Sequence, residues 1–200
     1  DNPYATPSNP VVVKMGYYNI NPSTGEQYRY TGTTGGWVKD SLFNISAVNS
    51  LGGVRWVLTW SQFTSALLDP SVRSIHLATY LTATTQAYIP LNQSTIKEID
   101  GHGFEINIPS SIDTGFVRRY GSLSEANQGI DQQLRFRNVS FKGANTNMCM
   151  YISANYGMTI EDCRFYNFTT ALDLRWCMAT VIDHCFFWEN YIGVNLDYDR

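Results

Sequence analysis

The sequence is poor in charge and has no excess of basic residues. Only 16% of its 200 residues are charged, and the formal net charge is −3, with an isoelectric point of about 5.5. A protein that binds nucleic acid needs a concentrated positive surface, so this balance excludes nucleic acid as a partner. The sequence also lacks any run of about 18 apolar residues, which excludes the insertion of an apolar helix into a membrane.

Residues that bind metals or form disulfides are scarce as well. The chain has four cysteines and three histidines, with no Cys-x-x-Cys pair. Because His76, His102 and His184 are scattered along the sequence, we expect no metal site and no cofactor. Cys163 and Cys185 fall at equivalent inward positions of a repeat, where the geometry for a disulfide is poor. We therefore expect all four thiols to be free.

What the sequence does contain is a repeat in residues 134–197. Three alternating segments end in Phe141, Phe165 and Phe187, at successive steps of 24 and 22 along the chain. A second alternating pattern recurs between them in steps of 22, as Met150-x-Ile152, Leu172-x-Leu174 and Val194-x-Leu196. A period of roughly 20–50 residues is typical of stacked supersecondary units. Alternation of apolar and polar residues is typical of strands with one buried face.

This repeat predicts an all-β fold, a right-handed parallel β-helix with about 22 residues per coil. A unit of two short strands cannot bury its own apolar face, whereas coils stacked at about 4.8 Å bury their faces in one column. We expect Val139, Cys163 and Cys185 to lie above one another inside the coils. A column of phenylalanines, one from each segment of the repeat, should lie beside them.

The residues before the repeat predict a different organisation. Residues 1–10 are rich in Pro, Asn and Ser and should form an extended arm. Residues 11–54 contain a strand–turn–strand pattern and should form a small β-rich attachment module. The β-helix is expected over residues 55–200 and to be incomplete at its C-terminus, with more coils or another domain beyond residue 200.

One short helix is expected near the start of the β-helix, at about residues 60–68. Thr59 and Gln62 have the spacing of a capping box, and apolar residues follow at helical spacing. Trp56, Trp60 and Phe63 should form a hydrophobic plug in the first coil. Residues 109–133 break the register of the repeat and are expected to form an inserted loop.

The order of these features resembles the entry to pectin-lyase-like parallel β-helices, especially bacteriophage tailspikes and related virion appendages. In such proteins a helix plugs the first coil. An Ile-Pro step follows, here Ile89-Pro90, and then a Gly-x-Gly turn, here Gly101-His102-Gly103. The later coils resemble a recurring rung of the family, present as Ile160-Glu161-Asp162-Cys163-Arg164-Phe165.

The resemblance implies a structural component of a phage tailspike or tail fibre, an extracellular virion protein. It implies a homotrimer that attaches to other virion proteins through residues 1–55 and engages a host polysaccharide with its β-helix. The alternative is a polysaccharide-degrading enzyme, a lyase or a glycoside hydrolase, on the same fold. A third alternative is a bacterial surface adhesin. Because one fold serves many activities, the side chains must decide between them.

Two outward carboxylates are the candidate catalytic residues. Alignment of the coils puts Asp173 and Asp197 on neighbouring coils, offset by two positions, at a separation of roughly 8 Å. That separation is compatible with an inverting glycosidase. In the other interpretation, Arg175 lies against Asp197 as a surface ion pair. Since no lyase or galacturonase motif is present, we expect no enzyme activity in this segment. By the same alignment, Arg137 should lie beside Glu161 and offset its charge.

Outward aromatic residues are the candidate contacts with glycan or a partner. They are Trp176, Trp188 and Tyr191, whose rings can stack on sugars or on proteins. The alternative is that the tryptophans pack under loops or between chains. His184 occupies the turn position that Asp162 holds one coil earlier, and we expect it to act as a hydrogen-bonding turn residue rather than as an acid or base.

Overall fold

The chain, in its computed structural model, divides into two units, Asp1–Gly52 and Gly53–Arg200. The structure describes residues 53–90, 97–119 and 134–197, and in the first unit only the backbone of three strands. These strands form an antiparallel sheet in the order β1 (Tyr18–Ile20), β2 (Glu26–Tyr30) and β3 (Trp37–Asn44). The arm expected over residues 1–10 lies outside the described residues.

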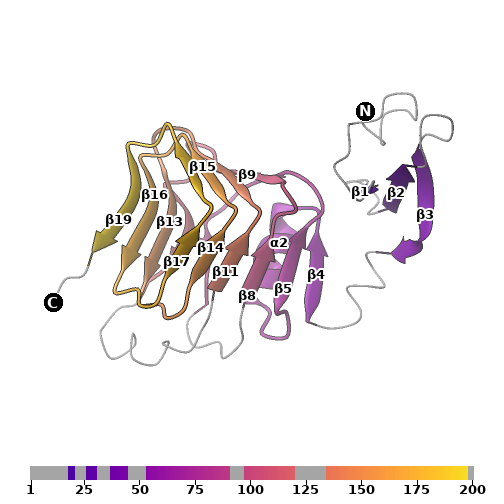
Figure 1. The fold of residues 1–200 in the computed structure, drawn as a ribbon, viewed down its shortest axis with the longest axis horizontal. Coiled ribbons are helices and arrows are strands. Elements are labelled where there is room, and N and C mark those ends of the chain that lie inside the picture. The colour runs from indigo at the N-terminus through magenta and orange to yellow at the C-terminus, as the bar shows by residue number, and fades with distance from the viewer. Residues whose placement is uncertain are drawn as a thin grey trace. The chain divides into compact units, whose positions relative to one another are not determined.

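The second unit is a parallel β-helix, as the repeat predicted (Figure 1). From β5 onward each coil contributes one strand to each of three parallel sheets, and β4, which is followed by a helix, adds a sixth strand to the first sheet. The first sheet contains β4 (Val54–Val57), β5 (Ser74–Leu77), β8 (Lys97–Asp100), β11 (Leu134–Arg137), β14 (Thr159–Glu161) and β17 (Val181–Asp183). The second sheet contains β6 (Leu81–Thr82), β9 (Glu105–Asn107), β12 (Ser140–Lys142), β15 (Arg164–Tyr166) and β18 (Phe186–Trp188). The third sheet contains β7 (Ala87–Tyr88), β10 (Thr114–Arg118), β13 (Met148–Ser153), β16 (Thr170–Arg175) and β19 (Ile192–Asp197).

The prediction of two strands per coil was wrong, because a left-handed residue divides each segment that ends in phenylalanine. Asn138, Asp162 and His184 occupy this turn in successive coils, with φ of 54°, 52° and 48°. Asn, Asp and His tolerate this backbone conformation better than other non-glycine residues. The chain therefore turns a corner between the first and second sheets, and His184 is a turn residue as expected.

The interior contains the predicted columns. The rings of Phe141, Phe165 and Phe187 are stacked, with 5.0 Å between successive centroids. Val139 and Cys163 are fully buried, and Cys185 in the last described coil is half-buried. The four cysteines are free. A hydrogen bond between the two stacked thiols raises the pKa of Cys163 and lowers that of Cys185.

The expected helix is α2 (Trp60–Leu68), and it is capped as the sequence predicted. The Thr59 hydroxyl accepts a hydrogen bond from the Gln62 backbone N–H at 3.2 Å. The Gln62 side chain in turn accepts from the N–H of Leu58 at 2.8 Å, one position before that of an ideal capping box. Trp60 and Phe63 are buried and plug the first coil, as expected.

The prediction of a loop over residues 109–133 was partly wrong, because β10 lies within this range. Phe116 of β10 is fully buried and packs edge to face against Phe63 of the plug and Phe136 of the next coil. In the sheet, Phe116 pairs with Met150, so the chain between these partners is much longer than one unit of the repeat. Because this coil is longer, β10 does not fall at the spacing of the repeat and could not be recognised from it. Residues 120–133 lie outside the described residues.

Candidate functional site

The outer face of the second sheet presents two parallel columns of side chains. Its strands alternate, so Phe141 and Phe165 point into the core while their neighbours point outward. One column contains Glu105, Ser140, Arg164 and Phe186, and the other contains Asn107, Lys142, Tyr166 and Trp188. Aromatic residues thus occupy the later coils of this face, and polar or charged residues occupy the earlier ones.

Three of these side chains, Tyr166, Phe186 and Trp188, form what we call the outer aromatic patch. Phe186 is 58% exposed and Trp188 is 56% exposed, whereas Tyr166 is half-buried. The Tyr166 hydroxyl donates a hydrogen bond to the carboxylate of Glu105, two coils earlier. Burial, together with this bond, raises the pKa of Tyr166. The phenol therefore stays protonated at neutral pH, with its ring fixed beside Trp188.

The chemistry of this face suits a ring-shaped ligand with an apolar face and polar edges. An aromatic ring offers a large rigid surface at little cost in conformational entropy, and a sugar ring can stack on it through its C–H groups. Arg164 lies on the same strand as Tyr166, Lys142 lies one coil earlier on the same face, and both supply hydrogen-bond donors. A carbohydrate chain lying along the coils would meet both kinds of group.

The other two aromatic candidates lie at opposite ends of the third sheet. Tyr191 is 88% exposed and precedes β19, in the same turn that follows Trp188. Trp176 follows β16, is half-buried, and has φ of 50°. The strand β16 between these ends spans about 20 Å. The structure therefore places Tyr191 near the outer aromatic patch and Trp176 away from it.

The two candidate carboxylates lie together, and Arg175 joins them. Its guanidinium donates to both oxygens of Asp173, at 3.3 and 3.2 Å, and lies 3.4 Å from the carboxylate of Asp197. The side-chain amide of Asn195 also donates to Asp173, at 3.2 Å. A general acid must carry a proton, and a proton on Asp173 would disrupt these bonds. The arrangement favours an ion-pair network over an acid–base pair.

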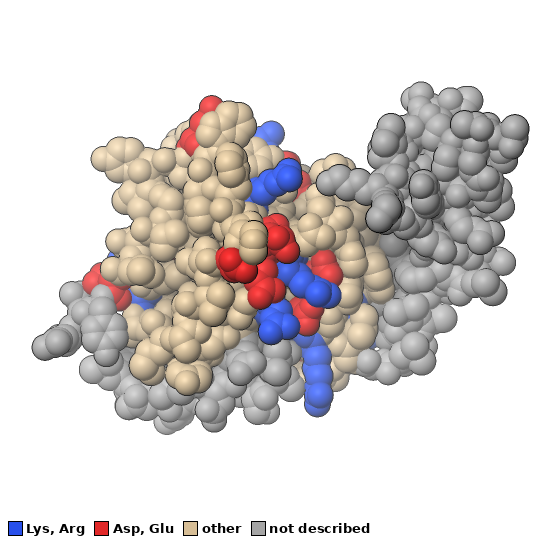
Figure 2. All heavy atoms as spheres, viewed as in Figure 1, with Lys and Arg blue, Asp and Glu red and all other residues tan. Residues whose placement is uncertain are grey.

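Arg137 and Trp56 do not lie as the sequence suggested. Arg137 is paired in register with Glu161, but its guanidinium contacts Glu98 at 2.8 Å and Asp100 at 2.9 Å on the other side. Acidic and basic side chains gather over the middle strands of the first sheet (Figure 2). Trp56 is not part of the plug, because alternation along β4 turns Val57 inward and Trp56 outward.

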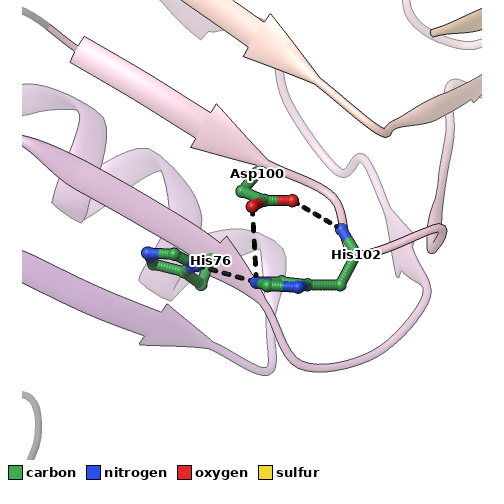
Figure 3. Close-up of side chains that lie close together, drawn as sticks. All are labelled: His76, Asp100 and His102. Atoms are coloured by element: carbon green, nitrogen blue, oxygen red, sulfur yellow. Dashed lines mark hydrogen bonds and ion pairs between the residues drawn. The ribbon is translucent and has the colours of Figure 1, made fainter. Parts of the chain in front are cut away.

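The expectation that the histidines are scattered was also wrong for two of them. The coils bring His76, Asp100 and His102 together, with ligand atoms that all lie within 4.8 Å of one another (Figure 3). The sequence does hold a signal for this. The step from His76 to Asp100 equals the step from Phe141 to Phe165, and the two residues pair in register on neighbouring strands. His184 lies beside Asp183, outside this cluster.

Comparisons with known proteins agree with the fold. Residues 54–172, more than half of the chain, match the family model described as "Putative pectate lyase-like adhesive domain". No curated protein and no solved structure matches the chain. Among the described residues, no helix has the length and hydrophobicity to cross a bilayer. The chain belongs to the pectate lyase-like adhesive domain family.

Proposed function

We propose that this chain is an adhesive β-helix that holds surface polysaccharide on the outer face of its second sheet. The observation that carries the proposal is the outer aromatic patch, in which exposed Trp188 lies in register with half-buried Tyr166 on the preceding coil and exposed Phe186 lies on the same strand as Trp188. Single exposed apolar residues are common on soluble proteins, but clustered aromatic side chains mark contact surfaces. Arg164 beside the patch and Lys142 on the preceding coil extend the surface along the direction in which a polymer would lie.

Binding without cleavage is the activity that the ion pairs favour. Arg175 joins buried Asp173 to partly exposed Asp197 in one network, so the charge of Asp173 is already paired. Polysaccharide hydrolysis would need one of these carboxylates as an acid and the other as a base. We therefore propose a contact role for this segment rather than the lyase or hydrolase alternative.

The test is to measure binding of the full chain to a panel of capsular and cell-wall polysaccharides. Trp188→Ala should weaken binding by roughly 30-fold, the loss of about 2 kcal/mol that a central aromatic contact contributes. Tyr88→Ala is the matched control, because Tyr88 is a 59% exposed aromatic residue on the third sheet. Equal effects of the two substitutions would overturn the proposal. Shortening of the polysaccharide that is lost in Asp173→Asn would favour the enzyme instead.

We further propose that the adhesive role is exercised in a phage appendage, as a homotrimer attached to other virion proteins through residues 1–55. What supports this is the resemblance to tailspikes, namely the plug helix followed by the Ile89-Pro90 step and the turn at His102. Threefold symmetry would multiply weak contacts with host glycan. Mass photometry of the intact protein should give three times the mass of one chain, and a stable monomer would overturn this part of the proposal.

A further inference from the structure

The outer face of the first sheet carries a second cluster that the adhesive role does not use. His76 lies on β5, Asp100 ends β8, and His102 lies in the turn that follows β8 (Figure 3). His76 Nδ1 lies 2.7 Å from His102 Nε2, and His102 Nε2 lies 3.8 Å from Asp100 Oδ2. Two imidazole nitrogens and one carboxylate oxygen thus lie within 4.8 Å of one another.

The backbone holds these groups in place. His76 and Asp100 are paired in register, so their side chains leave the sheet side by side. His102 has φ of 50°, and its N–H donates to Asp100 Oδ1 at 2.9 Å. This turn folds its ring back over the strand end. Trp56 stacks on both imidazoles, with centroid distances of 4.8 and 4.9 Å, and restricts their rotation.

We propose that His76, Asp100 and His102 bind a divalent transition-metal ion, Zn²⁺ above all, through His76 Nδ1, His102 Nε2 and Asp100 Oδ2. Two histidines and a carboxylate are a donor set that zinc accepts, with the fourth position open to water or another ligand. Zinc lies about 2.0–2.2 Å from such donors, which places ligand atoms of a tetrahedral site about 3.3 Å apart. The 2.7 Å contact must open by about 0.6 Å and the 3.8 Å contact must close by about 0.5 Å to reach that geometry. The third separation, between His76 Nδ1 and Asp100 Oδ2, is at most 4.8 Å and must close by up to about 1.5 Å.

The outer contacts of the cluster fit a metal site. Ser74 Oγ lies 2.9 Å from His76 Nε2 and can accept its N–H, which leaves the Nδ1 lone pair for the ion. Asp100 is held twice, by the His102 N–H and by Arg137 at 2.9 Å. Carboxylate oxygens have two lone pairs, so Asp100 can bind a metal and still accept from Arg137. Glu98 contacts the same guanidinium and offsets its charge.

A histidine binds a metal ion in its neutral form. A bound ion would link β5 to β8 and its following turn, which are parts of two successive coils, and should stabilise the start of the β-helix by mass action.

The experiment is a calorimetric titration of chelator-treated full-length chain with ZnCl₂ at pH 7.5. We expect one ion per chain and a higher melting temperature with zinc. His102→Gly should weaken binding by more than about 10-fold without harm to the turn, since glycine accepts a positive φ. His184→Ala is the matched control, because His184 is an exposed histidine outside the cluster. Its affinity should be unchanged.

Two further variants separate this site from other sources of metal binding. Asp100→Asn should weaken binding, and Co²⁺ in place of Zn²⁺ should give the visible absorption of a tetrahedral site that disappears in His102→Gly. The thiols are the competing ligands, so Cys185→Ser should leave the affinity unchanged. Absence of binding, binding that survives in a His76→Ala/His102→Gly double variant, or binding lost in Cys185→Ser would each overturn the proposal.

Discussion

Replacing Phe165 by alanine should destabilise the β-helix more than the same change at Phe187, the next ring of the phenylalanine column. Phe165 is fully buried and has a stacked ring on each side, those of Phe141 and Phe187, both at 5.0 Å. A buried Phe→Ala change costs about 3–5 kcal/mol, and each aromatic pair contributes about 0.5–1.5 kcal/mol beyond area. Since two pairs are lost, we expect a cost of about 5 kcal/mol, at the upper end of the range.

Two matched variants make the test specific to the register. Phe187→Ala loses one stacked pair from a half-buried side chain and should cost about 2 kcal/mol. Phe186→Ala removes an adjacent, 58% exposed ring and should change stability by less than about 0.5 kcal/mol. Urea unfolding followed by circular dichroism measures all three. With a slope of about 2 kcal/mol/M, a loss of about 5 kcal/mol lowers the midpoint by about 2.5 M.

The test depends on the order of the stability losses among the variants, and this order can still be measured if Phe165→Ala fails to fold. Phe165→Leu keeps most of the volume but loses both stacked pairs, so it should cost about 1–3 kcal/mol. That is still more than the cost of Phe186→Ala. If Phe186→Ala were as costly as the Phe165 variants, the assignment of inward and outward residues along these strands would be refuted.

Three other predictions follow from single contacts. Because a hydrogen bond from the neighbouring buried thiol lowers the pKa of Cys185, this cysteine should react with iodoacetamide first at pH 7, and peptide mapping that finds another thiol ahead of it would contradict this. Gly143→Ala should lower the stability by more than about 2 kcal/mol, since the added Cβ would lie 2.3 Å from a backbone carbonyl oxygen of the next coil. Gly193→Ala should be tolerated, because the atom nearest to its added Cβ lies at 3.6 Å. Equal melting temperatures of the two variants would refute this. A hydrogen bond to Asp183 raises the pKa of His184, so this pair stabilises the fold below pH 6.5 and its contribution is lost as pH rises through the raised pKa. In an NMR titration, Asp183→Asn should return the midpoint of the His184 titration toward 6.5. An unchanged midpoint would contradict this.

The columns of the β-helix could be predicted because they repeat. Each coil buries the same positions, so the regular spacing of Phe141, Phe165 and Phe187 in the sequence predicts that their rings stack. The cap of α2 was equally readable, since Thr59 and Gln62 form it within one turn of chain. In both cases the contacts are local or strictly periodic, and the sequence alone contains the spacing that creates them.

Contacts that break the period could not be predicted in this way. The long coil that pairs Phe116 with Met150 hid β10. Lys97 reads as a surface residue, yet it is buried and its ammonium donates to the backbone carbonyls of Asp69 and Val72. Its role depends on where the helix ends in space, which no spacing along β8 reveals.

The candidate sites also include features that the period of the repeat predicts and features that it does not. The outward position of Trp188 followed from alternation after Phe187. The pairing of Arg137 with the previous coil rather than with Glu161 did not, because a long side chain can reach either neighbour and the choice depends on where the acidic groups are densest. The cluster around His76 needed both the step from one coil to the next and the left-handed turn at His102.

The most direct test of the adhesive role is to observe the tryptophans while polysaccharide binds. The chain has five tryptophans, and their indole N–H signals can be followed separately by NMR. Addition of a bound polysaccharide should shift the signal of Trp188 and leave that of Trp60, which is buried in the plug, unchanged. Shifts confined to Trp176 or Trp56, with Trp188 unmoved, would contradict the assignment of the contact surface to the outer aromatic patch.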